Sequence, residues 1–201
     1  MKDFWEERYS SPLFVYGESP NDFLAESLHK LTPGIIILPC DGEGRNSVFA
    51  AKTGWNTYAF DISEAGKTKA LQLANKVGVE VDFQVADALL ITYPENTADA
   101  VALIYAHLPV LIRQALHKKV ISWLKPGGKL ILEAFNPLQL NNESGGPKNI
   151  DMLYTKDMLN ADFSKLRIDY IEDVEIELCE GDFHNGKANV IRLIATKLQV
   201  S

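Results

Sequence analysis

The sequence lacks the features by which several classes of protein are recognised. Its only two cysteines, Cys40 and Cys179, lie far apart and form no CxxC pair, and reduced thiols are typical of the cytoplasmic location that we predict. The four histidines have no spacing that would pair them with cysteines or carboxylates as ligands. We therefore expect no bound metal.

Long apolar runs and clusters of basic residues are also absent. The longest apolar run, Ile35–Leu38, is far too short to cross a bilayer, and the charged residues 2–6 lead us to expect no secretory signal. Lys and Arg number 20 against 27 Asp and Glu, which gives a net charge of −7. Negative charge opposes binding to phosphate backbones, so we expect neither a nucleic-acid partner nor a membrane partner.

The chain does contain enough apolar material for one core. Of its 201 residues, 46% are hydrophobic, which suits one domain and is short for two. No repeat, low-complexity stretch or linker-like segment is visible. We expect a single domain over residues 1–201, as a monomer or a homodimer.

Short β-branched runs alternate with helical patterns along most of the chain. Strands are predicted at 35–38, 57–61, 81–85, 98–105 and 129–134, and helices through about residue 53, at 63–77 and at 109–124. The first run is wholly apolar, as is typical of a strand buried on both faces of a parallel sheet. The alternation predicts an α/β fold, in which a mostly parallel sheet carries helices on both faces.

Both ends of the chain depart from this alternation. A short helix is predicted within the aromatic-rich residues 2–18, and Ser19 is expected to cap a second helix that starts at Pro20.

After residue 135 the pattern changes to a loop and then to alternating strands. A loop rich in Asn, Gly and Pro at 136–150 precedes a weak helix near 155–161. Strands at 174–178 and 188–196 then predict an antiparallel hairpin, with Asn185-Gly186 as its turn.

Polar residues follow three successive predicted strands. The turn Cys40-Asp41-Gly42-Glu43-Gly44 follows the first, Asp61 ends the second and Asp87 follows the third. Taken one at a time, the three features have ordinary structural explanations: a tight turn, a helix N-cap for Asp61 and a solvated loop residue for Asp87. Together they lie where open α/β sheets bind ligands, with Asp61 placed to accept ribose hydroxyls and Asp87 an adenine amino group. The sequence therefore predicts an adenosine-ligand site.

The order of these motifs resembles a class I S-adenosylmethionine-dependent methyltransferase, and within that superfamily the tellurite-resistance-type enzymes. The similarity includes Gly42-Glu43-Gly44-Arg45-Asn46, Asp61, Asp87-Ala88 and Leu124-Lys125-Pro126-Gly127-Gly128. It implies a Rossmann-like sheet of seven strands, the last inserted antiparallel between the fifth and sixth. It also implies methyl transfer from S-adenosylmethionine to a small-molecule acceptor such as a thiol, a chalcogen oxyanion or another metabolite.

The resemblance implies a set of cofactor contacts. Asp61 would bind the ribose, Asp87 and Ala88 the adenine, and the 40–44 turn the methionine part, while residues 1–18 would form a lid. The implied cofactor-binding residues are Tyr16, Cys40, Asp41, Gly42, Gly44, Asn46, Asp61, Ile62, Asp87, Ala88 and Tyr105.

The first motif departs from the family pattern. The family usually ends its first strand with an acidic residue and follows it with Gly-x-Gly, but Leu38 and Cys40 stand at those positions. Asp41 is expected to hold the cofactor's amino group in place of the missing acid. If Asp41 does not do so, the chain would be a weak or inactive binder of the cofactor.

The acceptor side is expected to involve residues 136–161 and the terminal hairpin. His107 is the candidate base for an oxygen or nitrogen acceptor, because it titrates near neutral pH; a structural histidine at a strand end is the alternative. His184 could reach the acceptor, or else be an exposed turn residue. Asn149, Tyr154 and Arg192 are the remaining acceptor-side candidates, with Arg192 as an anion-binding group.

Two other functions stay open on the sequence alone. A nicotinamide-dependent reductase would use the same turn and Asp61, but the turn has few glycines and the chain has no Tyr-x-x-x-Lys pair. A non-catalytic sensor that binds an adenosine ligand would be consistent with the altered first motif.

Overall fold

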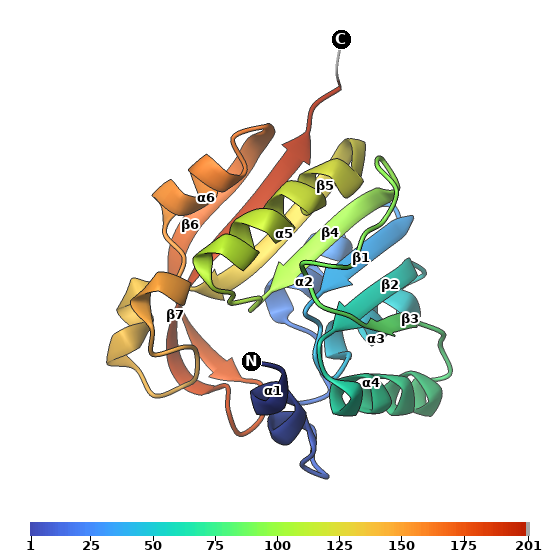
Figure 1. Ribbon diagram of the computed structural model, residues 1–201, viewed down its shortest axis with the longest axis vertical. Helices are drawn as coiled ribbons and strands as arrows, with labels where there is room; N and C mark the ends of the chain where they lie inside the picture. Colours follow the sequence, from blue (N-terminus) through green and yellow to red (C-terminus); the bar gives the residue numbers. More distant parts are fainter. Residues whose placement is uncertain (200–201) are drawn as a thin grey trace.

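The computed structural model describes residues 1–199 and is organised around a seven-stranded sheet of order β3-β2-β1-β4-β5-β7-β6 (Figure 1). The strands are β1 (Ile35–Pro39), β2 (Asn56–Asp61), β3 (Asp82–Val85), β4 (Ala98–Ile104), β5 (Leu124–Phe135), β6 (Leu166–Cys179) and β7 (Asn185–Lys197). The first five strands are parallel, and β7 lies antiparallel between β5 and β6. The predicted fold class and the inserted last strand are confirmed.

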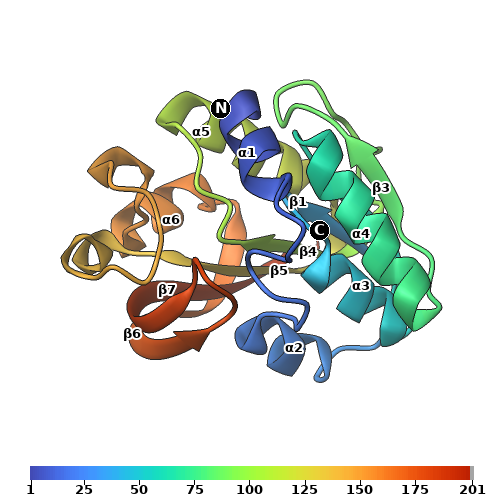
Figure 2. The same ribbon diagram turned by 90° about the horizontal axis from the view of Figure 1, so that it is seen from below.

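Helices cover both faces of the sheet (Figure 2). They are α1 (Lys2–Tyr9), α2 (Asp22–Leu28), α3 (Arg45–Lys52), α4 (Glu64–Val77), α5 (Val110–Trp123) and α6 (Lys156–Asp162), with short 3-10 turns at Pro137–Asn141 and Ile150–Met152. One core packs α5 and α6 against the sheet, and a second packs α2, α3 and α4 against the other face. None of the helices in the described residues is long and apolar enough to span a membrane.

The second helix begins later than predicted. Its N-cap is Asn21, whose side chain accepts a hydrogen bond from the Leu24 N–H at 3.0 Å. Ser19 and Pro20 therefore precede the helix. Both Ser and Asn are good caps, and the tertiary contact decides between them, because the Asn21 N–H also donates to Asn46 Oδ1 at 3.0 Å.

The terminal hairpin forms, but its turn is not Asn185-Gly186. Asn185 is already paired with Cys179 as the first residue of β7, so the turn is Glu180–His184. The strands are also longer than predicted, and β6 begins at Leu166. This longer hairpin carries the 180–184 turn to the carboxyl edge of the sheet, beside α1 (Figure 1).

Candidate active site

One cavity of about 450 Å³ opens at the carboxyl ends of β1 to β4. Parallel strands end at the same edge, so the 40–44 turn, Asp61 and Asp87 meet there although they are distant in sequence. Figures 1 and 2 show α1 lying beneath this edge, between α4 and the hairpin turn. The N-terminal segment thereby closes one side of the cavity through Trp5, Tyr9 and Tyr16.

Asp61 is a buried carboxylate held by the backbone. Its Oδ2 accepts from the Gly42 N–H at 3.0 Å, and its Oδ1 accepts from the Ser63 N–H at 3.1 Å. Burial raises its pKa to about 6, although these hydrogen bonds act to lower it. A carboxylate oxygen can accept more than one hydrogen bond, so both oxygens keep capacity for ligand hydroxyls.

Asp41 is a second carboxylate of the cavity, and it has fewer partners. Its Oδ2 accepts from the Ser47 N–H at 3.2 Å, and burial raises its pKa to about 7. Within residues 1–199, no Lys, Arg or His nitrogen lies within 4.0 Å of the carboxylate of Asp41 or Asp61. Neither of these two desolvated acids of the cavity is thus paired with a cation of residues 1–199, which favours a ligand that brings positive charge.

Two strand ends beside these acids have an unusual backbone. Cys40 follows β1 with φ 57°, and Tyr105 follows β4 with φ 52°. Side chains in the left-handed region are uncommon and collect at functional sites. β1 and β4 are neighbours in the sheet, so both strained residues border the same cavity.

Glu43 fixes the segment that follows α1. Its carboxylate accepts the Val15 N–H at 3.2 Å and the Tyr16 N–H at 3.3 Å, and it pairs with Lys69 of α4 at 2.5 Å. Because Glu43 is only 4% exposed, these contacts are poorly screened by water. They hold Tyr16 against the cavity.

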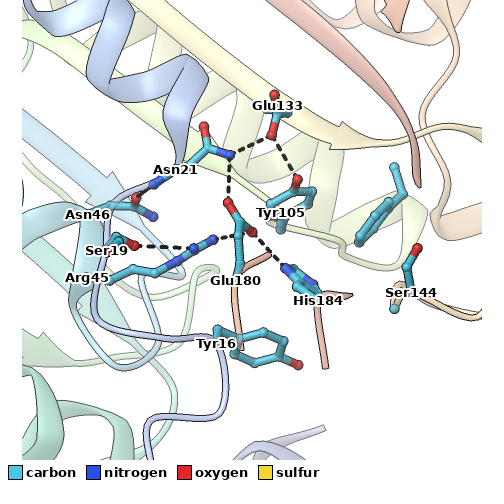
Figure 3. Close-up of polar contacts among 12 residues, drawn as sticks. Tyr16, Ser19, Asn21, Arg45, Asn46, Tyr105, Glu133, Ser144, Glu180 and His184 are labelled. Carbon is cyan, nitrogen blue, oxygen red and sulfur yellow. Dashed lines mark hydrogen bonds and ion pairs between the residues drawn. The ribbon is translucent and has the colours of Figure 1, made fainter. Parts of the chain in front are cut away.

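Behind the cavity lies a buried polar network, drawn in Figure 3. Glu133 of β5 accepts from Asn21 Nδ2 at 2.6 Å and from the Tyr105 hydroxyl at 2.8 Å. Glu180 accepts from Arg45 Nη2 at 2.8 Å and lies 3.1 Å from His184 Nδ1. The network therefore links α2, α3, β4, β5 and the hairpin turn at one end of the cavity.

Comparison with curated sequences gives related enzymes of one kind. Residues 38–128 match the family model described as "Methyltransferase domain". Phosphoethanolamine N-methyltransferase 1 of Arabidopsis thaliana is 26% identical over 118 residues, which are 59% of this chain and 24% of the relative. The chain thus spans about a quarter of the length of the curated relatives it matches.

Solved structures share the fold at low sequence identity. The structure described as "Conversion of a Disulfide Bond into a Thioacetal Group during Echinomycin Biosynthesis" has a TM-score of 0.81 at 16% identity, over 100% of this chain and 93% of the other. TehB from Haemophilus influenzae has a TM-score of 0.71 at 15% identity, over 98% and 66%. Magnesium protoporphyrin IX methyltransferase from Synechocystis PCC 6803, with bound SAH, has a TM-score of 0.71 at 18% identity, over 98% of this chain and 99% of the other.

Family model and fold agree. Residues 38–128 are similar to a methyltransferase domain, and residues 1–199 share the fold of the solved structures. Both comparisons agree with the family, the enzyme class and the cofactor that the sequence predicts.

The fold brings nearly all of the predicted cofactor-binding residues to the cavity. Tyr16, Cys40, Asp41, Gly42, Asn46, Asp61, Ile62, Asp87, Ala88 and Tyr105 line it. Gly44 does not: it is the N-cap of α3, and a Cβ on it would lie 2.4 Å from the Ala70 Cβ of α4. Its role is to let two helices pack closely.

His107 lines the cavity, but both of its ring nitrogens are used by the fold. Nδ1 lies 2.7 Å from the Met152 carbonyl oxygen, and Nε2 accepts the Phe135 N–H at 3.1 Å. Burial lowers its pKa to about 4. With no free nitrogen, His107 is a structural histidine in this arrangement, and the geometry argues against its predicted role as a base.

Of the four acceptor-side residues predicted from the sequence, only His184 lines the cavity. Asn149 caps a 3-10 turn, and the Tyr154 hydroxyl donates to the Ala106 carbonyl at 2.5 Å. Arg192 donates to Glu133 at 2.6 Å across the β5–β7 pair, so it is not a free anion-binding group. His184 itself is 6% exposed, which corrects its reading as an exposed turn residue.

Sequence reasoning missed Glu133, Glu180 and Arg45. A signal for the first was present: Glu133 interrupts an apolar run, as Arg192 does in the opposite strand. A charged residue inside a strand that is otherwise buried needs a partner of opposite charge. Nothing local marks Glu180, whose neighbours in the sequence read as an ordinary polar turn.

Proposed function

We propose that this chain binds S-adenosylmethionine along the edge formed by β1, β2 and β3 and transfers its methyl group to a small-molecule acceptor. The pair of buried carboxylates, Asp41 and Asp61, supports this proposal most strongly. Both have a raised pKa and neither has a cation partner in the described chain. The cofactor carries an ammonium group, a sulfonium group and two ribose hydroxyls, which are the groups that such a pair would stabilise.

The remaining lining residues fit the rest of the cofactor. Ala88, Leu108 and Ile112 give the adenine a mostly apolar pocket, while Asp87 lies beside it as an acceptor for the amino group. The volume of about 450 Å³ is within the usual range for small-ligand sites. Asp41 would take the ammonium group and so replace the acid that the first strand lacks.

When bound, the cofactor supplies an electrophilic methyl group on sulfur. The chain's own contribution is to orient the acceptor and to exclude water. Tyr16 and Tyr105 border the end of the cavity nearest the polar network, beside the aromatic residues Phe135 and Phe183. We propose that the acceptor lies there.

The class of acceptor is proposed from both the cavity and the relatives. The matched plant enzymes are phosphoethanolamine N-methyltransferases, so small phosphorylated amines join thiols and chalcogen compounds as acceptors to test. Arg8 lines the same end of the cavity and has no carboxylate within 4.0 Å among residues 1–199. Its guanidinium, 3.8 Å from the Phe183 ring centre, could bind an acidic group of the acceptor.

Calorimetry with S-adenosylmethionine, S-adenosylhomocysteine and NADH tests the cofactor. We expect binding of the first two and none of NADH; binding of NADH alone would make the chain a nicotinamide enzyme instead. Transfer from methyl-labelled cofactor to a metabolite extract supplemented with phosphoethanolamine, thiols and tellurite tests the reaction. Tight binding without any transfer would indicate a sensor.

A further inference from the structure

His184 occupies an unusual position for a turn residue. It ends the Glu180–His184 turn, yet it is buried between two tyrosines of the cavity, with its ring centre 4.6 Å from that of Tyr16 and 4.6 Å from that of Tyr105. One edge of the ring faces Glu180 (Figure 3). The residue therefore belongs to the acceptor end of the site.

The partner of Nδ1 fixes the tautomer of this imidazole. An ionised carboxylate can only accept hydrogen bonds, so Nδ1, at 3.1 Å from Glu180 Oε2, must carry the proton. In the neutral ring the lone pair then lies on Nε2. Within residues 1–199, Nε2 has no hydrogen-bond partner, whereas both nitrogens of His107 have one.

Glu180 is held in its ionised form by its surroundings. Burial acts to raise its pKa, but the hydrogen bond from His184 and the charge of Arg45 lower it to about 2. Asn21 Nδ2 donates to its other oxygen at 3.4 Å. The carboxylate can therefore both orient His184 and stabilise the positive charge that protonation would create.

The charged groups around His184 leave the ring neutral near pH 7. Burial lowers its pKa, and Arg45 acts in the same direction, while Glu180 and Glu133 oppose them. The two tyrosines beside the ring are neutral because burial raises the pKa of both hydroxyls.

A glycine leaves the Nε2 edge uncovered. Gly145 lies in the loop after β5 and lines the cavity. A Cβ on this residue would lie 2.7 Å from His184 Cδ2 and 3.3 Å from Nε2. Its φ of 121° also disfavours any other residue. The Ser144-Gly145-Gly146-Pro147 segment thus keeps that edge of the ring free of side chains.

We propose that His184 is the general base of methyl transfer, oriented by Glu180, and that the acceptor is protic: an amine, a hydroxyl compound or a thiol. Nε2 takes the proton from the acceptor atom as that atom bonds to the methyl carbon. The methyl–sulfur bond breaks with its electron pair left on sulfur, and the proton leaves later to solvent. This inference rests on the proposed function.

The other histidines do not offer this arrangement. His107 uses both nitrogens within the fold, His117 is a buried residue of α5 with Nδ1 2.8 Å from Asp162, and His29 is exposed. Neither His29 nor His117 lines the cavity. His29 therefore serves as a matched control for substitution.

Nitrogen-15 NMR of the histidine-labelled protein tests the tautomer without any acceptor. We expect one ring, absent from the spectrum of His184→Gln, to be neutral at pH 7 with its proton on Nδ1. Glu180→Gln should allow a mixture of tautomers, whereas Glu175→Gln on the exposed side of β6 should not. A proton on Nε2, or a charged ring at pH 7, would overturn the proposal.

Kinetics then separates this inference from the proposed function. His184→Gln should lower kcat for label transfer to the metabolite extract by roughly 100-fold or more, the usual contribution of a general base, with the calorimetric Kd for S-adenosylmethionine within about threefold of wild type. His29→Gln should change neither. Full turnover by His184→Gln would reject the role of His184 as the base and would leave the proposed function in place. Failure of the wild type to bind the cofactor, or to label any metabolite, would reject both proposals.

Discussion

At the scale of single residues, the cavity depends on acidic side chains that serve both the fold and a ligand. Asp61 joins the 40–44 turn to the start of α4 through the Gly42 and Ser63 amides. Those bonds fix the direction of the carboxylate before any ligand binds. A carboxylate that is already oriented loses little conformational entropy on binding.

The first prediction concerns this preorganised carboxylate. Asp61→Asn keeps the shape of the side chain and removes its charge, so the ribose hydroxyls lose a charged acceptor. Affinity for S-adenosylmethionine should fall more than tenfold, or by about 1.4 kcal/mol or more, in calorimetry. Asp82→Asn, an exposed change at the start of β3, is the control. Unchanged affinity in folded Asp61→Asn would place the ribose elsewhere.

The second prediction follows from the raised pKa of Asp41, about 7. A cationic ligand favours the ionised form, so cofactor affinity should rise between pH 5.5 and 8 and binding near pH 6.5 should release protons. Asp61, with a pKa of about 6, adds to the lower part of this range. Calorimetry in buffers of different ionisation enthalpy counts the protons.

Asp41→Asn tests the assignment of that pH dependence. It should weaken binding at pH 8 and flatten the pH profile above pH 6.5. The free protein should show the opposite trend: because the folded pKa lies above the unfolded value, wild-type stability declines as pH rises from about 4 to 7. The stability of the Asp41→Asn variant should decline less over the same pH range. Equal slopes in both proteins would remove Asp41 as the titrating group.

At the scale of elements, α1 is joined to the start of α4 through a hydrogen-bonded cap. Glu6 of α1 accepts from the Ser63 hydroxyl at 2.8 Å and from the Glu64 and Ala65 amides at 2.9 and 3.1 Å. The bond from Ser63 is the main reason why its pKa is lowered. A side chain from one helix thus caps the first turn of α4, which otherwise has unpaired N–H groups.

The third prediction tests this attachment. Glu6→Ala removes the cap, which is worth roughly 1 kcal/mol, and should loosen the segment that closes the cavity. We expect cleavage near residues 10–13 by a limiting protease to become several-fold faster, and cofactor affinity to fall several-fold. Glu7→Ala, an exposed change on the same helix, should do neither. Identical cleavage rates in all three proteins would show that α1 is held by other contacts.

At the scale of the whole molecule, the cavity touches nearly every part of the fold. Its lining comes from α1, from the ends of four parallel strands, from the loop after β5 and from the hairpin turn. These segments are far apart in the sequence. A ligand in the cavity would therefore link them, and its binding energy would add to the stability of the folded chain.

The fourth prediction measures that linkage. At about 100 times its Kd, a ligand stabilises the folded state by roughly 2.7 kcal/mol. For a chain of this size, that energy corresponds to a rise in Tm of about 5–10 °C. Differential scanning fluorimetry with S-adenosylhomocysteine should show this rise, and Asp61→Asn should lose most of it at the same concentration. No rise at saturation, established by calorimetry, would mean that the ligand does not connect these segments.

The sequence alone determined the alternation of strands and helices, because apolar periodicity is a local property that survives in the fold. It also placed Asp41, Asp61 and Asp87 at one edge, since parallel strands bring their carboxyl ends together. Tertiary structure decided which histidine of residues 1–199 lines the cavity with a ring nitrogen that has no hydrogen-bond partner. It also decided which residues pair with the buried charges. Glu133 and Arg192 are 59 positions apart and lie opposite each other only in the β5–β7 register. No local pattern specifies such a partner, because it is fixed by the pairing of distant strands.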